Sequence, residues 1–417
     1  MEGTEMAGMP AYEYLFSQSM IAGLTFENRL IRAATWDPSL LAERRMTAAV
    51  LDVYRQLAAG GIGAILTGDI PVVPEGLLED PDVSAPDNTY QAVRVEGFAE
   101  LPRAVRMENP SCRIFAQLSA DAMGFAPSKI PSPYTQDQNA EFSACQIAAI
   151  ITCFVNAIEG LQQEGFDGVE LHAAHGGLLS QFLSPYTNRR TDQFGGCLEN
   201  RVRILAEILA YARSRAGDFP IVVKLNSTDY IPGGVDFDSF PALAAAVEAA
   251  GVDAIELSGG MWDCLIRPEE DLGFPPVPSP ESHTCLSSRG RQSYFLPAAE
   301  KLSLGIPLIL TGGNRDAGYL ESLIKGGNVD FIGLCRPLIR EPDLPGRWKR
   351  GESSGVRCIA CNACIYEMWT HVMAGKPWVT RCLLDEEPER WKEAQLWLNR
   401  WVEENALPDI DAAAFFA

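Results

Sequence analysis

One pattern of polar and apolar positions recurs along the chain: an Ala-, Leu- and Glu-rich stretch of helical character, then a glycine, then a short apolar run. Four segments show it most clearly, and they enter the apolar run through Gly61, Gly165, Gly251 and Gly327. A glycine just past a helix is typical of the left-handed cap that ends it. Each of these segments therefore predicts a helix followed by a strand.

Other apolar runs lie between these segments, and three of them follow or begin with a proline: Pro110, Pro220 and Pro307. Proline is tolerated at the first residue of a strand but not at the centre of a sheet. Together with NRLIRAAT near the start of the chain, the pattern predicts eight strands. They are expected at residues 30–35, 62–67, 113–118, 167–172, 221–226, 253–258, 306–311 and 329–334.

Near-continuous apolar strands that alternate with helices are typical of parallel sheets covered by helices. Eight such units predict an α/β fold in which the strands close into a (β/α)8 barrel, the TIM-barrel architecture. A doubly wound open sheet is the alternative. No G-x-G-x-x-G follows any of the eight runs, so the usual dinucleotide-binding signature of the open sheet is missing.

The segments outside this repeat differ in composition. Residues 70–110 and 262–300 are long and rich in Pro, Ser, Asp and Glu, and long loops in compact domains commonly act as lids or binding loops. Beyond residue 345 a group of cysteines precedes an amphipathic helix, which we expect to dock on the barrel or on a second copy of the chain. Its apolar face comprises Trp391, Leu398 and Trp401 with Trp397 or Leu396.

Composition and charge narrow the class of function. The 417 residues are 47% apolar and 21% charged, and 55 acidic against 34 basic side chains leave a net charge of −21. Such a surface repels polyanions, so we expect no nucleic acid and no membrane as partner but a small-molecule substrate. There is no run of 18 apolar residues, the start has no signal-peptide features, and the eleven cysteines are scattered. We therefore expect a cytoplasmic protein without a disulfide framework, and leave open whether it forms a homo-oligomer.

Catalysis in a barrel of this kind takes place where the strands end. Polar groups at the ends of apolar strands are costly without a partner or ligand, and here they predict a polar small-molecule ligand. These end positions are Ala34-Thr35-Trp36, Gly68-Asp69, Gln117 and Ser119, His172 with His175, Lys224 and Asn226, Ser258-Gly259-Gly260, Thr311-Gly312-Gly313, and Cys335-Arg336.

The last two groups suggest a phosphate site, because barrels often hold a phosphate between the loops after strands 7 and 8. Gly312 and Gly313 allow close approach to backbone N–H groups, and Arg336 offers a guanidinium fork suited to phosphate oxygens. An ordinary tight turn is the alternative interpretation of the two glycines. The pattern favours a phosphorylated ligand.

Lys224 and Gln117 are expected to face the middle of the barrel mouth. Lys224 has three interpretations: a Schiff-base nucleophile, a fixed cation beside an anionic ligand, or the ion-pair partner of a carboxylate such as Glu170 or Glu256.

His172 and His175 directly follow the fourth strand. Together they can donate two hydrogen bonds to one substrate oxygen, and a buried structural pair is the alternative. No third histidine or carboxylate stands at metal-ligand spacing, so we expect no metal at this site.

The segment GFDGVELHAAHGGLLSQFLSPYTNRRTDQFGGCLENRVRIL resembles the signature of the old yellow enzyme (NADH:flavin oxidoreductase) family. ENRLIRAAT, GGIGAILTGD, PLILTGG and FIGLCRPLIREP occur in matching order. The resemblance implies an FMN-binding barrel over residues 14–345, with residues 1–13 as an N-terminal tail and residues 346–417 as a cysteine-containing helical extension. It also implies FMN as the cofactor, with NADH or NADPH as the reductant.

The resemblance assigns individual roles as well. His172 and His175 would be catalytic, holding the substrate carbonyl oxygen so that hydride can pass from flavin N5 to the β-carbon of a conjugated double bond. Gln117 and Lys224 would face the pyrimidine edge of the flavin and Arg336 its phosphate. The full set of implied cofactor-binding residues is Ala34, Thr35, Trp36, Gly68, Gln117, Lys224, Gly312, Gly313, Cys335 and Arg336.

Three positions near the site depart from the family pattern. Gly177 stands where ene-reductases carry a tyrosine that donates a proton, so water or a loop residue such as Tyr90 or Tyr186 would have to serve. Trp36 and Cys335 are larger than the residues usual at their positions.

The fourth departure is the C-x2-C-x2-C-x17-C group formed by Cys358, Cys361, Cys364 and Cys382. It is similar to the iron–sulfur motif of the dienoyl-CoA reductase and trimethylamine dehydrogenase branch, with different spacing. We expect packed free thiols, and a zinc or iron–sulfur site is the alternative.

These features predict an FMN-dependent oxidoreductase of the ene-reductase type, which transfers hydride from NADH or NADPH through flavin to an activated C=C bond of a small carbonyl compound. Three alternatives stay open. They are a flavin-dependent dehydrogenase or desaturase in the same site, a lysine-dependent aldolase that uses Lys224, and a non-catalytic scaffold on the same barrel.

Overall fold

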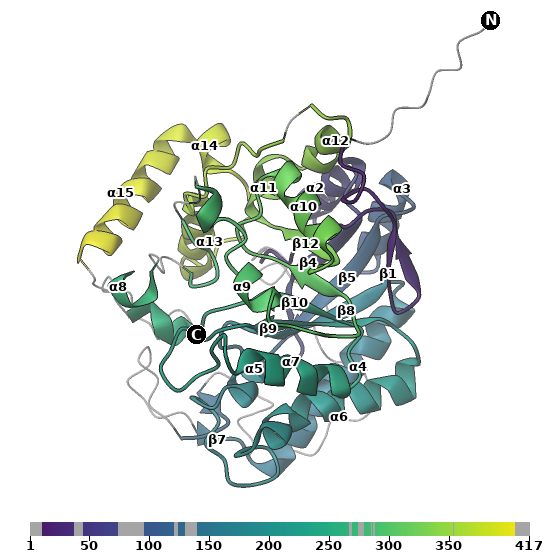
Figure 1. The fold of residues 1–417 in the computed structure, drawn as a ribbon, viewed down its shortest axis with the longest axis vertical. Helices are drawn as coiled ribbons and strands as arrows, with labels where there is room; N and C mark the ends of the chain where they lie inside the picture. Colours follow the sequence, from purple (N-terminus) through teal and green to yellow (C-terminus); the bar gives the residue numbers. More distant parts are fainter. Residues whose placement is uncertain are drawn as a thin grey trace, which may run out of the picture.

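The computed structural model describes residues 11–36, 45–73, 96–120, 124–129, 140–266, 269–273, 279–284, 286, 288–352 and 354–404. These parts of the chain form a barrel of strands surrounded by helices, with the last three helices gathered at one side (Figure 1).

Eight parallel strands close the barrel, as the hydrophobic pattern predicts. In chain order they are β3 (Leu30–Arg32), β4 (Ala64–Pro71), β5 (Arg113–Ser119), β8 (Gly168–Ala173), β9 (Ile221–Asn226), β10 (Ala254–Ser258), β11 (Leu308–Leu310) and β12 (Phe331–Leu334). Each strand pairs with the next one along the chain, and β12 returns to β3 with Ile332 opposite Leu30. The predicted (β/α)8 barrel is therefore confirmed.

Helices cover the outside of the barrel. They are α2 (Ala48–Ala59), α3 (Glu100–Glu108), α4 (Ala144–Gln163), α5 (Leu178–Leu183), α6 (Leu198–Ala216), α7 (Phe240–Ala249), α9 (Leu296–Ala299), α10 (Ala317–Gly326), α11 (Arg336–Arg340) and α12 (Leu344–Lys349). The predicted cap glycines Gly61, Gly165, Gly251 and Gly327 have φ between 76° and 96°. This left-handed conformation turns the chain from helix to strand at each of them.

Helix α4 shows how local sequence and packing agree. It begins at a capping box, in which the Ser143 hydroxyl accepts from the Gln146 N–H and the Gln146 side chain accepts from the Ser143 N–H. By length and composition alone α4 could cross a membrane, but 67% of its apolar window is buried in the protein. It packs against α6, β5 and β8, which is the position of a core helix.

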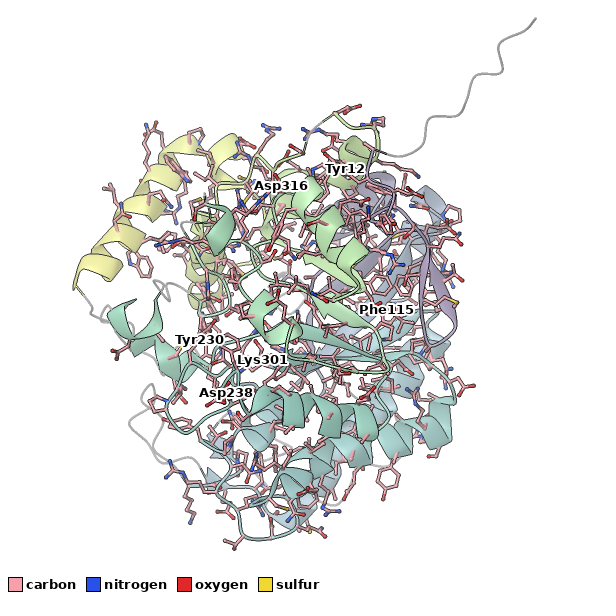
Figure 2. All side chains as sticks on the ribbon, in the orientation of Figure 1. Tyr12, Phe115, Tyr230, Asp238, Lys301 and Asp316 are labelled. Atoms are coloured by element: carbon pink, nitrogen blue, oxygen red, sulfur yellow. The ribbon has the colours of Figure 1, made fainter. Side chains whose placement is uncertain are left out.

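Apolar side chains fill the end of the barrel at which the strands begin. A hairpin of β1 (Ser19–Ile21) and β2 (Leu24–Phe26) brings Phe26 to Phe331 and Phe115, with ring centroids 5.2 and 6.0 Å apart. Phe115 is labelled among the side chains of Figure 2. Because this end is a packed core, the place for a ligand is the opposite end, where the strands terminate.

The remaining elements lie in connections and after the barrel. They are β6 (Phe125–Ala126), β7 (Ala140–Glu141), η2 (Trp262–Ile266), α8 (Glu269–Leu272), η3 (Arg289–Arg291), α13 (Ala363–Met373), α14 (Leu383–Glu386) and α15 (Pro388–Glu404). Helix α15 packs on α13 and α14. Leu398 is 6% exposed and Leu396 63% exposed, so Trp397, which contacts Tyr366, joins the buried face instead of Leu396. The side chain of Trp401 lies outside the described residues.

Candidate functional site

A cavity of about 580 Å³ opens among the residues that end the barrel strands, within the roughly 300–1,000 Å³ typical of small-molecule sites. Ten of the twelve site residues predicted from the sequence line it: Ala34, Thr35, Trp36, Gln117, His172, His175, Gly312, Gly313, Cys335 and Arg336. The closure of the barrel brings distant segments together. Thr35 and Cys335, 300 positions apart, approach to 3.0 Å between Oγ1 and Sγ.

The two histidines lie against each other, with ring centroids 4.8 Å apart in an edge-to-face arrangement. Nε2 of His175 is 2.6 Å from the Ser258 hydroxyl oxygen, and its backbone N–H donates to Asn226 Oδ1 at 3.0 Å. His175 has a φ of 61°. A non-glycine residue stays in this left-handed conformation only where its surroundings hold it there, and such strain is common at functional sites.

Both imidazoles are neutral near neutral pH. Burial lowers the pKa of His172 well below its usual value, and the nearby His175 and Lys224 lower it further. Burial, together with Lys224, lowers the pKa of His175 to about 3. Within the described residues, Nδ1 of His172 is buried and has no hydrogen-bond partner. A neutral imidazole with an unused nitrogen beside a cavity can bind a polar atom of a ligand.

Lys224 belongs to a buried cluster of charges. Its Nζ is 2.7 Å from Glu256 Oε1 and 3.9 Å from Glu170 Oε2. The cavity-lining Gln117 donates to Glu170 Oε2 at 2.5 Å, and Thr311 donates to Glu256 Oε1 at 2.7 Å. Of the three interpretations of Lys224, the ion pair is the one that describes these contacts, and Lys224 is not among the described residues that line the cavity.

The protonation states in this cluster follow from the geometry. Burial opposes the charge of Lys224, but the Glu170 and Glu256 carboxylates outweigh it and raise the pKa of the ammonium. Burial and the Glu256 carboxylate raise the pKa of Glu170 well above its usual value. Burial also acts to raise the pKa of Glu256, but Lys224 outweighs it and leaves that pKa lowered. The cluster therefore pairs Lys224 with Glu256, and Glu170 is the one of the two carboxyl groups in which the protonated form is favoured.

Gly68 is the second predicted residue that is not among the described residues lining the cavity, whereas its neighbour Asp69 lines it. The register of β4 against β5 shifts between Leu66 and Asp69. The Gly68 N–H donates to the Tyr54 hydroxyl at 3.2 Å, and its carbonyl accepts from the Thr67 hydroxyl at 2.8 Å. A bulge of this kind changes which residues point inward, and sequence periodicity does not reveal it.

The corner formed by Gly312, Gly313 and Arg336 fits a phosphate. The two glycines have φ of 103° and 76°, and a Cβ on either would lie 2.7–2.8 Å from the Tyr294 ring, so only glycine is compatible with both the backbone and the packing. Arg336 is 8% exposed, and its Nη1 donates to the His283 carbonyl and to Asn362 Oδ1. A fixed guanidinium beside a glycine turn that lines the cavity suits phosphate oxygens.

Residues missed by the strand-end analysis complete the cavity. Trp262 and Tyr294 come from residues 262–300, whose length and composition had marked a binding loop, while Trp369 and Thr380 come from the C-terminal extension, where no sequence signal pointed to the site.

Of the two loop tyrosines predicted as proton donors, the structure describes one. Gly177 lines the cavity, as the family pattern implies for that position. Tyr186 is not among the described cavity-lining residues, and Tyr90 lies outside the part of the chain that the structure describes.

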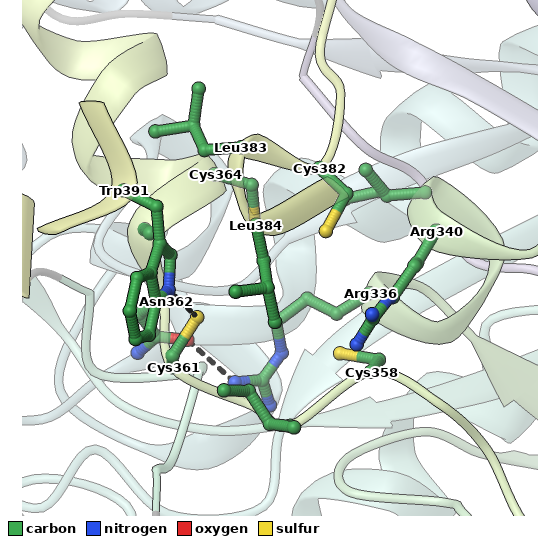
Figure 3. A pocket seen from close by; sticks show the side chains of 13 residues that line it. Arg336, Arg340, Cys358, Cys361, Asn362, Cys364, Cys382, Leu383, Leu384 and Trp391 are labelled. Carbon is green, nitrogen blue, oxygen red and sulfur yellow. Dashed lines mark hydrogen bonds between the residues drawn. The ribbon is translucent and has the colours of Figure 1, made fainter. Parts of the chain in front are cut away.

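The four cysteines of the C-terminal motif, Cys358, Cys361, Cys364 and Cys382, line a second, smaller cavity (Figure 3). Among the described residues, no three His, Cys, Asp or Glu side chains are arranged so that they could hold one metal ion. Cys364 and Arg336 line both cavities, so the thiols lie directly beside the larger one.

Comparison with known proteins adds to this geometry. A family model described as the NADH:flavin oxidoreductase / NADH oxidase family matches residues 15–354. The chain is 30% identical to the NADH oxidase of Thermoanaerobacter brockii over 370 residues, which cover 85% of this chain and 54% of that protein. It is 34% identical to the NADH-dependent flavin oxidoreductase nadA of Aspergillus parasiticus over 326 residues, 73% of this chain and 70% of that protein.

Solved structures show the same fold. A 2-naphthoyl-CoA reductase complex has a TM-score of 0.73 at 24% identity and covers 92% of this chain, which in turn covers 58% of that one. The old yellow enzyme homologue from Zymomonas mobilis has a TM-score of 0.63 at 21% identity. The match covers 82% of this chain and 94% of that one. The chain spans little more than half the length of the Thermoanaerobacter relative.

Proposed function

Since the chain belongs to the NADH:flavin oxidoreductase family, whose cofactor is FMN, we propose that it passes hydride from NADH or NADPH through FMN to the activated C=C bond of a small carbonyl compound. The observation that carries this proposal is a single cavity in which the His172–His175 pair, Gln117 and the Gly313–Arg336 corner come together. The first suits a carbonyl oxygen, the second a pyrimidine edge and the third a phosphate.

FMN supplies the hydride-transfer chemistry when it is bound. In this proposal Arg336 and the N–H groups of Gly312 and Gly313 hold the phosphate, and Gln117 binds the pyrimidine edge. Lys224, which pairs with Glu256, acts on the site only through Glu170, the carboxyl that accepts the hydrogen bond of Gln117. The neutral imidazoles of His172 and His175 donate hydrogen bonds to the substrate oxygen and so stabilise the negative charge that develops there as hydride reaches the β-carbon.

One observation favours a second candidate, a flavin-dependent dehydrogenase or desaturase in the same cavity. The resemblance places Gly177 where a tyrosine acid would stand, and Tyr186 is not among the described cavity residues, so in this proposal water delivers the proton to the α-carbon. An oxidation needs no such donor. The aldolase alternative loses support, because Lys224 is held as a cation between two carboxylates.

The test is a flavin spectrum followed by anaerobic mixing. We expect the purified protein to be yellow, to release FMN on heating, and to bleach rapidly with NADH or NADPH and recover colour with an enal. Bleaching by a saturated carbonyl compound, with no response to nicotinamide, would support the dehydrogenase instead. A colourless protein that binds no added FMN would refute both.

We further propose that Cys358, Cys361, Cys364 and Cys382 hold an iron–sulfur cluster, the alternative to packed thiols. The four thiols line one cavity, and four cysteine thiolates are the usual ligand set of an iron–sulfur cluster. We expect iron and acid-labile sulfide in the protein purified without oxygen, and neither in Cys364→Ser. Zinc alone, or no metal, would refute this.

We also propose a cytosolic enzyme of small molecules rather than a nucleic-acid-binding protein. The net charge of −21 supports this, as do the ten described cysteines, none of which forms a disulfide.

A further inference from the structure

Three tryptophans from distant parts of the chain line one side of the large cavity. Trp36 follows β3, Trp262 opens η2, and Trp369 lies on α13 of the C-terminal extension. The Trp369 ring centroid is 5.2 Å from that of Trp36 and 5.3 Å from that of Trp262, with interplanar angles of 54° and 85°. These are contact distances for aromatic rings, so the three indoles form a continuous row, which we call the tryptophan wall.

The tryptophan wall is fixed at both ends. At one end the Trp36 carbonyl accepts a hydrogen bond from the Thr380 hydroxyl at 3.0 Å. At the other end Trp262 packs beside Gly176, where a Cβ would lie 3.6 Å from Trp262 Cδ1. Since Gly176 directly follows His175, the wall extends from the histidine pair to the segment that carries Thr35.

The surroundings of the tryptophan wall are apolar. Helix α13 adds Ile365, Met368 and Val372 to the cavity lining, and none of the described α13 residues that line the cavity carries a charge. The acidic and basic side chains of this helix, Glu367 and His371, are not among the described lining residues. The cavity therefore has a polar end at the histidines and an aromatic, uncharged side at the wall.

We propose that the tryptophan wall is the specificity element of the site, and that it selects a neutral carbonyl compound whose double bond is conjugated to a flat ring. The carbonyl oxygen lies at His172 and His175, and the ring lies along Trp262 and Trp369. This inference rests on the proposed function. In the reaction, hydride from NADH or NADPH reaches the β-carbon by way of flavin, water protonates the α-carbon, the C=C bond becomes a single bond and the nicotinamide is oxidised.

The C-terminal extension is thus part of the active site rather than a helix docked at a distance. A short aliphatic enal can use the histidines but leaves the indole faces of the wall uncovered. A ring-bearing enal covers them and removes apolar surface from water. A contact of this size in an apolar pocket changes kcat/KM by about 10- to 200-fold.

The test compares cinnamaldehyde with crotonaldehyde, two enals that differ only in a phenyl or methyl group on the β-carbon. We expect the wild-type holoenzyme to favour cinnamaldehyde in kcat/KM by at least about 10-fold. Trp369→Leu should reduce this ratio about 10-fold, and Trp369→Phe should retain most of it. If Trp369→Leu does not fold, Trp262→Leu should reduce the ratio in the same way.

A matched control is Trp378→Leu, because Trp378 is a buried indole of the same extension that is not among the described cavity residues. It should leave the ratio unchanged. Equal kcat/KM for the two enals in the wild type, or equal losses for both in Trp369→Leu, would overturn the inference.

Binding without turnover separates this inference from the proposed function. Cinnamaldehyde should quench the tryptophan fluorescence of the wild type at concentrations about 10-fold lower than in Trp369→Leu. If this difference is seen but neither enal oxidises NADH or NADPH, the wall stands and the proposed reaction fails. If both enals are reduced but binding is the same in the two proteins, the wall is refuted.

Discussion

Replacement of Lys224 by methionine removes the cation from the buried cluster beside Gln117. The Lys224 side chain is 5% exposed, and those of Glu170 and Glu256 are fully buried. Breaking a buried pair by removing one partner costs about 3–5 kcal/mol, and we expect the free energy of unfolding at pH 7 to fall by this amount. Without the ammonium, burial is the largest remaining influence on Glu256 and is opposed by hydrogen bonds from Thr311 and Glu170, so we expect its pKa to change from lowered to raised.

The pH dependence of the free energy of unfolding is a sharper test than the size of the stability loss at one pH. A carboxyl whose pKa is raised in the folded protein stabilises it fully below the unfolded pKa of about 4.3, and this contribution is lost as pH rises toward the folded pKa. A carboxyl whose pKa is lowered contributes above the unfolded pKa, and its contribution is lost as pH falls. In the wild type, Glu170 is of the first kind and Glu256 of the second. In Lys224→Met both are of the first kind.

Each additional proton that the folded state retains changes the slope by about 1.4 kcal/mol per pH unit. Between pH 5.5 and pH 7.5, Lys224→Met should therefore lose more stability than the wild type, by up to about 2.7 kcal/mol if the folded variant keeps one additional proton over the whole range. Urea unfolding followed by tryptophan fluorescence at several pH values, at matched flavin content, measures this difference.

Glu256→Gln is the matched control. It leaves Lys224 with Glu170 as the remaining carboxylate of the cluster, so the pKa of Glu170 should fall and the slope above pH 5.5 should become flatter than in the wild type. The expected order of steepness is Lys224→Met, then wild type, then Glu256→Gln. Equal slopes in Lys224→Met and wild type would refute the assignment of Lys224 as the ion-pair partner that keeps Glu256 deprotonated.

Four further predictions concern the proposed site. His172→Ala should lower kcat/KM for an enal by about 10²–10³-fold with FMN content unchanged, as turnover and flavin absorbance will show. Arg336→Ala should do the reverse, raising the FMN Kd by about 10- to 100-fold in equilibrium dialysis, and equal losses in the two variants would contradict the separate roles. Gly313→Val should abolish FMN retention, because a Cβ there meets the Tyr294 ring at 2.8 Å; a yellow variant would disprove it. Because the pKa of His175 is about 3, kcat/KM should show no loss with a midpoint near the usual histidine value of about 6.5 when pH falls from 8 to 5.

Residues within a few positions of one another determined most of the fold. The four apolar runs after the glycines at 61, 165, 251 and 327, the three runs led in by prolines and the NRLIRAAT segment were together sufficient to predict all eight strands. A helix cap and a buried parallel strand depend on backbone conformation and apolar content over short stretches of chain. Once eight such units are counted, the closed barrel and the carboxyl ends of its strands as the site follow from known architecture.

Only the tertiary structure decided which contacts those residues make. Periodicity left Lys224 with three roles, and the neighbouring strands that carry Glu170 and Glu256 decided among them. It did not reveal the bulge that brings Asp69 rather than Gly68 to the cavity, or the place of Trp369, a residue of the extension, beside Trp36. Such contacts join segments far apart in the chain. They arise from the register of paired strands and from packing between helices, and no local pattern of apolar and polar residues contains that information.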